Sequence, residues 1–189
     1  MPLKSEQDAR PLPPMPRGAP LPGTPSAGLR ERWDSYGLTH VPYRLLMLAR
    51  MLDRAASITT RRGGAVTLAE WRVAANLSRL GETTVGALAD YALVDRAEVS
   101  RASHALEARG LVARRAHPGS RAKKLLRLTE AGEALVEDLG GQRRDFYAYL
   151  LDGLDEDQRR QFDDLLLHLA IRVEHYDAML HEPAAGGDA

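Results

Sequence analysis

Residues 84–115, TVGALADYALVDRAEVSRASHALEARGLVARR, decide the fold of this chain. Their apolar residues recur at spacings of three and four, which predicts two short helices. The first follows Thr84, and the second follows Asp95, which begins the capping-box pattern Asp95-Arg-Ala-Glu98. A tight connection over residues 92–94 joins the helices, and Gly110 ends the second. Two helices joined this closely are typical of a helix-turn-helix.

The flanking segments extend this pattern to a winged helix. Before it, TLAEWRVAANLSRL (residues 67–80) predicts a helix that opens with a second capping box and stops at Gly81. After it, strand-like residues 111–115 and 124–128 enclose the turn HPGS, residues 117–120. A β-hairpin directly after a helix-turn-helix forms the wing of a winged helix.

The two ends of the chain differ from this centre. Residues 1–30 hold eight of the eleven prolines and are predicted to be a disordered Pro-rich arm. The next segment, 31–62, is predicted to be helical, with a short helix near residues 29–36 and a long one over residues 39–62.

The C-terminal segment, residues 131–182, is predicted to form two further helices. The first begins after Thr129, is interrupted at Gly140-Gly141 and ends at Gly153. The second carries a stripe with spacings of 4, 4, 3, 4, 4, 3 and 4 from Leu154 to Leu180, which is apolar except at Gln158. Such a heptad-like stripe at the end of a chain favours a partner helix, whereas packing within the same chain is the alternative.

The predicted fold class is therefore mainly α with a small β-hairpin wing. The organisation is a winged helix-turn-helix over residues 65–130, flanked by long N- and C-terminal dimerisation helices.

Charge is unevenly distributed, although the chain as a whole has 26 basic and 26 acidic side chains. Residues 96–127 hold nine bases and two acids, a net of +7, and residues 150–189 hold three bases and ten acids, a net of −7. Because the basic segment coincides with the second helix and the wing, it favours contact with phosphates over a merely solvated surface.

The second helix of the pair has the character of a recognition helix. Its inner face carries apolar residues, and its opposite face carries groups that hydrogen-bond to base edges. Together with the wing bases, that face gives the predicted DNA-binding residues: Arg96, Ser100, Arg101, His104, Arg114, Arg115, Arg121, Lys123 and Lys124.

Other classes of protein are disfavoured. The chain has no cysteine, which excludes disulfides and thiolate metal sites and is consistent with a reducing cytoplasm. It has no apolar run long enough to cross a membrane and no apolar N-terminal signal segment. It also has no phosphate loop, nucleophile elbow or H-E-x-x-H motif, and its six histidines are scattered. We therefore expect no enzyme activity, catalytic residue, cofactor or metal.

The order of these motifs closely resembles that of the MarR family of bacterial transcriptional regulators, from about Thr39 to Leu180. The most specific pieces are VSRASHALEARGLVARR followed by RLTEAG. The resemblance implies a homodimer that binds a pseudo-palindromic operator in double-stranded DNA, most often as a repressor. One difference is Gly119, since the family commonly has at this place an Asp that helps to hold the wing.

The resemblance also implies release from DNA by a small effector, such as an aromatic carboxylate or its thioester. Such a ligand is expected where the first long helix meets the helix that carries Trp71. A constitutive winged-helix module that binds DNA or protein without an effector is the alternative. The candidate effector contacts are His40, Tyr43, Arg44, Met47, Trp71 and Arg72.

Overall fold

A computed structural model describes residues 24–181 apart from residue 36 and residues 63–65. This part of the chain is mainly helical and contains a small three-stranded antiparallel sheet, so the predicted fold class is confirmed. It divides into two compact units, one over Thr24–Phe146 and the other from Tyr147 onward.

Three helical segments begin the first unit. They are α1 (Ala27–Asp34), a single 3-10 turn (Leu38–His40) and α2 (Val41–Arg62). Helix α1 starts inside the predicted 1–30 arm because Ser26 caps it, its hydroxyl accepting a hydrogen bond from the amide of Leu29. The rest of the arm, to residue 23, lies outside the described residues, as do the predicted helix stop at Gly63-Gly64 and residue 36.

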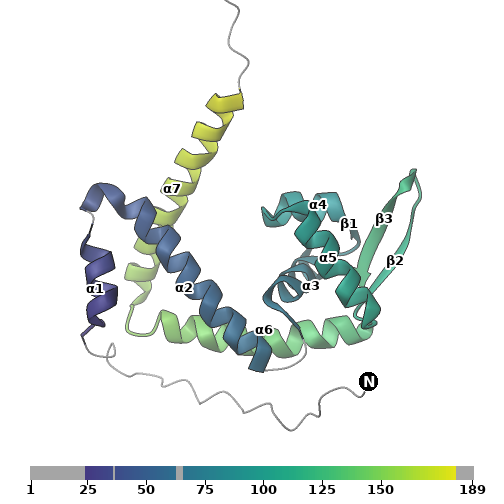
Figure 1. Cartoon of the computed structure of the whole chain (residues 1–189), viewed down its shortest axis with the longest axis horizontal. Coiled ribbons are helices and arrows are strands. Elements are labelled where there is room, and N and C mark those ends of the chain that lie inside the picture. The colour runs from purple at the N-terminus through teal and green to yellow at the C-terminus, as the bar shows by residue number, and fades with distance from the viewer. Residues whose placement is uncertain (1–23, 36, 63–65, 182–189) are drawn as a thin grey trace, which may run out of the picture. The chain divides into compact units, whose positions relative to one another are not determined.

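The helices of the winged helix lie at the predicted places. They are α3 (Leu68–Leu80), α4 (Val85–Ala92) and α5 (Arg96–Ala108), which gather into one bundle (Figure 1). Helix α3 opens with the predicted capping box, because the Thr67 amide donates to Glu70 Oε2 over 2.8 Å and the Glu70 amide donates to Thr67 Oγ1 over 3.2 Å.

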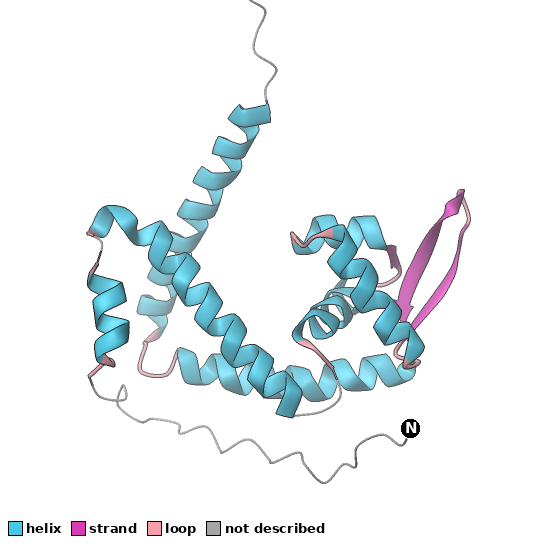
Figure 2. Cartoon of the chain, in the orientation of Figure 1, coloured by secondary structure: helices cyan, strands magenta, loops and turns pink. Residues whose placement is uncertain are grey.

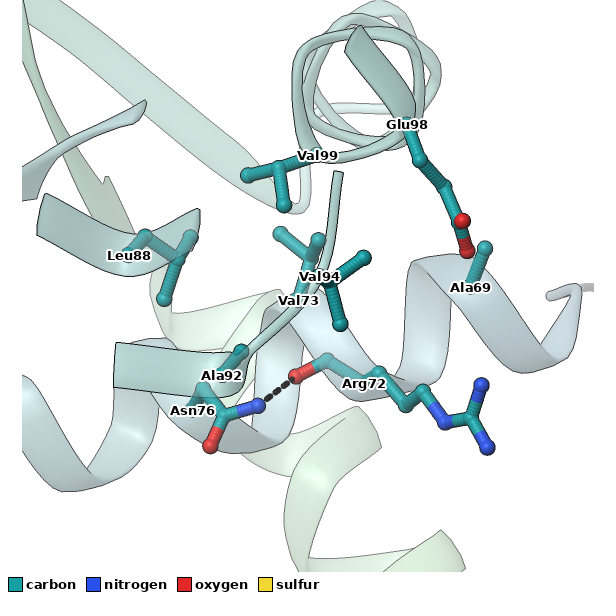
Figure 3. A pocket seen from close by; sticks show the side chains of 9 residues that line it. All are labelled: Ala69, Arg72, Val73, Asn76, Leu88, Ala92, Val94, Glu98 and Val99. Atoms are coloured by element: carbon teal, nitrogen blue, oxygen red, sulfur yellow. Dashed lines mark hydrogen bonds between the residues drawn. The ribbon is translucent and has the colours of Figure 1, made fainter. Parts of the chain in front are cut away.

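The second predicted capping box forms only by half. The Asp95 carboxylate accepts hydrogen bonds from the amides of Ala97 and Glu98 at the start of α5. Within the described chain the Glu98 side chain makes no return bond to Asp95. Instead, Glu98 lines a small cavity beside Ala69 of α3 (Figure 3).

The sheet has one strand more than the predicted hairpin. Its strands are β1 (Thr83–Thr84), β2 (Val112–His117) and β3 (Ser120–Leu128), in the order β1-β3-β2. Figure 2 shows β2 and β3 as a long hairpin beside the helices. The prediction missed β1 because two residues are too short for an alternating pattern. It also started β3 four residues late, at residue 124, since the turn is only Pro118-Gly119.

The core of the winged helix is a single apolar cluster shared by α3, α4, α5 and the strands. Leu77, Leu88, Leu106 and Leu126 are almost completely buried within it. Each such leucine contributes roughly 1.5–3 kcal/mol by leaving water. The cluster consists of Val66, Trp71, Val73, Ala74, Leu77, Leu88, Ala89, Val99, Ala102, Leu106, Val112, Leu126, Leu128 and Leu139.

Helix α6 (Glu130–Leu150) begins at a tightly closed junction. The Thr129 hydroxyl donates to the carbonyl of Gly110 over 2.7 Å and accepts from the amide of Gly132 over 3.2 Å. The Thr129 amide donates to the carbonyl of Leu111. One threonine therefore joins the end of α5, the start of β2, the end of β3 and the start of α6.

Helix α6 is continuous through Gly140-Gly141, so the predicted interruption there is wrong. A glycine inside a helix costs only about 1 kcal/mol relative to alanine, which surrounding contacts can offset. Here Trp71 of α3 lies close to Gly140, and the Arg144 side chain lies against both glycines.

The second unit is dominated by α7 (Glu156–His181). Asp155 and Gln158 form a capping box that the sequence analysis did not identify: Gln158 donates its amide to Asp155 and its side chain accepts the Asp155 amide in return. Gln158 therefore caps α7, in addition to its place in the predicted stripe. No residue of α7 is buried within this chain.

The junction at α6 makes a testable prediction about two glycines of the same helix. A Cβ added to Gly132 would lie 2.1 Å from the carbonyl oxygen of Leu111, whereas a Cβ at Gly140 would meet nothing closer than 3.5 Å. We expect Gly132→Ala to lower the free energy of unfolding by about 1–3 kcal/mol or more, because backbone must move. Gly140→Ala, the control, should raise it by about 0.5–1 kcal/mol. Urea denaturation measures both values, and equal effects would contradict the close approach.

Candidate nucleic-acid interface

A groove of about 890 Å³ lies between the N-terminal ends of α4 and α5 and the wing strands. Both helix ends bring amide groups and a partial positive charge to its wall. Two acids, Asp90 and Asp95, also line it, and Asp95 is occupied in capping α5. The full lining is Thr84, Val85, Gly86, Ala87, Asp90, Asp95, Arg96, Ala97, Ser100, Arg114, Lys123 and Lys124.

The predicted recognition helix has the expected two faces. Val99, Ala102 and Leu106 are buried in the core. On the other side, Arg96 and Ser100 line the groove, so five of the nine predicted DNA-binding residues share it. Arg101 and His104 are exposed on the same helix beyond the groove lining. The His104 Nδ1 lies 2.8 Å from the Ser100 carbonyl.

The wing supplies two exposed cations to the groove, Lys123 and Lys124 of β3. Within the described residues, no carboxylate lies within ion-pair distance of either lysine, and the same holds for Arg96 and Arg101. These four charges are therefore available to an external anion. The side chain of Arg121, also predicted to bind DNA, lies outside the described part of the structure.

Arg114 lies on the face of the sheet that packs against the helices, where it pairs with Leu126 in register. Its Nε is 2.6 Å from Glu107 Oε2 of α5, and only 15% of its side chain is exposed. The contact is an ion pair rather than an aligned hydrogen bond, since Nε and Nη2 are both buried without a hydrogen-bond partner. Arg114 therefore lines the groove, but Glu107 already compensates most of its positive charge.

Arg115 points to the other face of the sheet and forms a two-point contact with Glu82. Its Nε donates to Glu82 Oε1 over 2.6 Å, and its Nη2 donates to Oε2. These hydrogen bonds lower the pKa of the Glu82 carboxyl, with a smaller contribution from the charges of Arg115 and Arg127. Glu82 is therefore ionised at neutral pH.

Three of the nine bases in the basic segment are thus paired with glutamates, the third being Arg109 with Glu70 over 3.4 Å. The sequence count of +7 missed this, because Glu70 and Glu82 precede the segment in the chain. No local pattern identifies such partners, since 33 residues separate Glu82 from Arg115 and 39 separate Glu70 from Arg109.

The wing tip is closed by His117 at the place where the family's Asp is absent. The Gly119 amide donates to His117 Nδ1 over 3.0 Å across the two-residue turn. A Cβ at Gly119 would lie 3.5 Å from the His117 ring, which is ordinary contact, and Gly119 is not among the glycines with positive φ. The turn therefore does not require glycine at this position. The hydrogen-bond acceptor that holds the turn is the ring of His117.

The six predicted effector contacts do not meet around one described cavity. Arg44 stacks on Trp33, 5.4 Å from its ring centroid, and donates to its carbonyl. His40 contacts Thr39, and Arg72 binds Asp53 over 2.5 Å. Tyr43 is about half exposed on α2 and Met47 is half-buried there. Trp71 is buried, with Arg143 of α6 5.5 Å from its ring centroid.

Two other pockets in this unit are small. The first lies between α3, α4 and α5 and is lined by Ala69, Arg72, Val73, Asn76, Leu88, Ala92, Val94, Glu98 and Val99 (Figure 3). The second is lined by Thr60, Leu139, Gln142, Arg143 and Phe146. Each has a volume of about 10 Å³. That is the volume of about one water molecule, far below the roughly 300 Å³ at which ligand pockets begin.

Comparisons with known proteins agree with this geometry. A sequence model described as the MarR family matches residues 66–122, which run from the start of α3 into β3. No curated protein matches the chain. Among solved structures, a MarR/EmrR family transcriptional regulator from Acinetobacter sp. ADP1 is 26% identical, with a TM-score of 0.66 over 72% of this chain and 96% of that one.

Two further solved structures share the fold. The BpsR protein of Bordetella bronchiseptica, described with regulation of its DNA binding by 6-hydroxynicotinic acid, is 24% identical over 67% of this chain and 98% of that one, with a TM-score of 0.56. The PcaV transcriptional regulator of Streptomyces coelicolor, in complex with its natural ligand, is 24% identical over 65% and 89%, with a TM-score of 0.57.

The fold and the groove define a winged-helix protein. The family match over residues 66–122 and the solved structures confirm the resemblance to MarR-family transcriptional regulators that the sequence predicted. The Acinetobacter and Streptomyces proteins are both described as transcriptional regulators. In the described residues, no helix is both long and apolar enough to cross a membrane.

Proposed function

We propose that this protein is a MarR-type transcriptional repressor that binds operator DNA through the groove and the adjoining face of α5. One observation carries the proposal: Arg96 from α5 and Lys123 and Lys124 from the wing line the same groove, beside the N-termini of α4 and α5. DNA phosphates are attracted to such clusters of basic side chains that lack a carboxylate partner, and to the free backbone amides at helix N-termini. We also propose a cytoplasmic location, because that is where a bacterial operator would be bound.

The residues divide by role. In the proposed complex, α5 enters the major groove, where Arg101 reads a base edge and Ser100 and His104 add hydrogen bonds. Lys123, Lys124 and Arg121 neutralise phosphates along the wing, and Arg96 does the same at the start of α5. Arg114 and Arg115 are already paired with glutamates, so they contribute less than the other bases.

Two groups of substitutions test this division. Arg101→Ala should cost about 1–3 kcal/mol of binding free energy on a selected operator and relax its sequence preference at one position. Lys123→Ala with Lys124→Ala should weaken binding to all duplexes and lower the salt slope by about 0.9 for each lost phosphate contact. Fluorescence anisotropy over a salt series measures both effects.

Arg79→Ala is the matched control, because Arg79 is exposed at the end of α3 and is not part of the groove lining. It should bind as the unchanged protein does. Wild-type affinity and wild-type salt slope in both groove variants would overturn the assignment of these residues.

We propose that the protein binds DNA as a homodimer joined by its terminal helices. This is supported by α7, whose stripe residues are exposed in the single chain: Phe162 by 44%, Leu165 by 58% and Tyr176 by 61%. An apolar stripe of this length on a soluble chain is expected to be covered by a partner. Exposed apolar residues of α2, such as Leu46, would join the interface.

Acidic substitutions in the apolar stripe of α7 test the proposed dimer interface. Leu165→Asp with Leu169→Asp should convert the dimer to a monomer, because carboxylates would have to leave water at the interface. Light scattering after size-exclusion chromatography measures the mass. His175→Asp with Ala178→Asp adds the same charge to α7 away from the stripe and should leave the dimer intact. A dimer of unchanged stability with the first pair of substitutions would exclude this interface.

We propose that a small effector, an aromatic carboxylate or its thioester, releases the protein from DNA. The support is indirect: the BpsR and PcaV structures are described with 6-hydroxynicotinic acid and a natural ligand. The candidate contacts remain His40, Tyr43, Arg44, Met47, Trp71 and Arg72. An effector can shift the equilibrium only by its difference in affinity between the DNA-binding state and the released state.

The alternative is a constitutive winged-helix module without an effector, and the small size of the two pockets described above supports it. Thermal melting with a panel of aromatic acids and thioesters separates the two. A ligand at 100 times its dissociation constant stabilises the folded state by about 2.7 kcal/mol, which is a shift of several degrees. Tight DNA binding with no shift from any compound would favour the constitutive module.

A further inference from the structure

The contact between Glu82 and Arg115 spans the whole width of the sheet. Glu82 directly precedes Thr83 of β1, and Thr83 pairs with Leu126 of the central strand β3. Arg115 belongs to β2 on the opposite side, where it pairs with Leu125. The side chains therefore cross over β3 and connect the two outer strands.

The two ends of this contact belong to different parts of the winged helix. Glu82 follows Gly81, which ends α3 and donates its backbone amide to the carbonyl of Leu77. The backbone at Glu82 is therefore attached directly to the helical core. Arg115 lies two residues before His117 and the wing turn. Since β1 has only two paired residues, backbone hydrogen bonding ties the hairpin weakly to this edge. The Glu82–Arg115 contact adds a side-chain tie at that place.

The geometry of the contact favours a fixed arrangement. Two parallel hydrogen bonds between a guanidinium and a carboxylate fix the angle between the groups as well as their distance. Arg127 of the central strand also attracts the Glu82 carboxylate, which keeps the acid in place over the sheet. Arg115 is 52% exposed and Glu82 is 27% exposed, so solvent screens the pair and its strength is modest.

We propose that Arg115 is a positioning residue that, together with Glu82, sets the angle of the wing hairpin against the helix-turn-helix, and that it does not itself bind a DNA phosphate. The proposal rests on the proposed DNA-binding function and refines it. The opposite arrangement has Arg115 leaving Glu82 and binding a phosphate when DNA arrives, so that Glu82 competes with DNA.

The two arrangements predict opposite effects of Glu82→Gln on operator affinity. If Arg115 positions the wing, Glu82→Gln and Arg115→Gln both weaken operator binding, by about two- to fivefold, because each breaks the same pair. The salt slope stays unchanged, since no phosphate contact is lost. If Arg115 binds phosphate, Glu82→Gln tightens binding by removing a competitor, and Arg115→Gln lowers the salt slope by about 0.9.

Exchange of the two charges supplies the rescue. The variant E82R/R115E keeps the net charge and can restore the pair with its direction reversed. We expect the exchange to restore only part of the lost operator affinity, because the pair forms again while Arg127, which attracts Glu82 in the unchanged protein, repels the new arginine. Tighter binding by Glu82→Gln would overturn the proposal, as would a lower salt slope in Arg115→Gln.

A second readout separates this proposal from the DNA-binding proposal itself. Amide hydrogen exchange of β2 and β3 in the full-length protein without DNA should be faster in both glutamine variants and slower again in E82R/R115E. Unchanged exchange in both would show that the pair does not hold the wing. The control for Glu82→Gln is Glu133→Gln at an exposed acid on α6, which changes net charge by the same amount and should leave exchange and affinity as they are.

Discussion

The close approach of α6 to the carbonyl of Leu111 is the constraint on which the rest of the winged helix depends. Gly132 permits it because no Cβ intervenes, and Thr129 closes it with hydrogen bonds to Gly110 and Gly132. This junction fixes where α5 ends and where β2 and α6 begin. Helix α5 and the wing hairpin therefore meet at this junction, and residues of both line the groove.

The positive charge that this protein offers to an external anion depends on which basic side chains have no carboxylate partner. The basic segment loses three of its nine positive charges to Glu70, Glu82 and Glu107. The groove retains unpaired bases at Arg96, Lys123 and Lys124. In the proposed complex, attraction for phosphate therefore comes mainly from these three side chains and Arg101, whereas Arg114 and Arg115 contact Glu107 and Glu82.

Local signals made the helical part of the fold predictable. Capping residues such as Thr67 and Asp95 and stop signals such as Gly81 act over three or four residues, so sequence shows them directly. The strand β1 and the glutamate partners were not predictable, because they depend on contacts between segments more than 30 residues apart. The break expected at Gly140 failed for the same reason: Trp71 of a different helix packs there.

We propose that two winged helices, joined through the terminal helices, bind duplex DNA with their groove faces. Selection of bound duplexes from a random library tests this most directly. We predict enrichment of an inverted repeat whose half-sites lie about one helical turn apart, roughly 34–36 Å between centres. Enrichment of no sequence, or of one asymmetric site bound by a single chain, would contradict it.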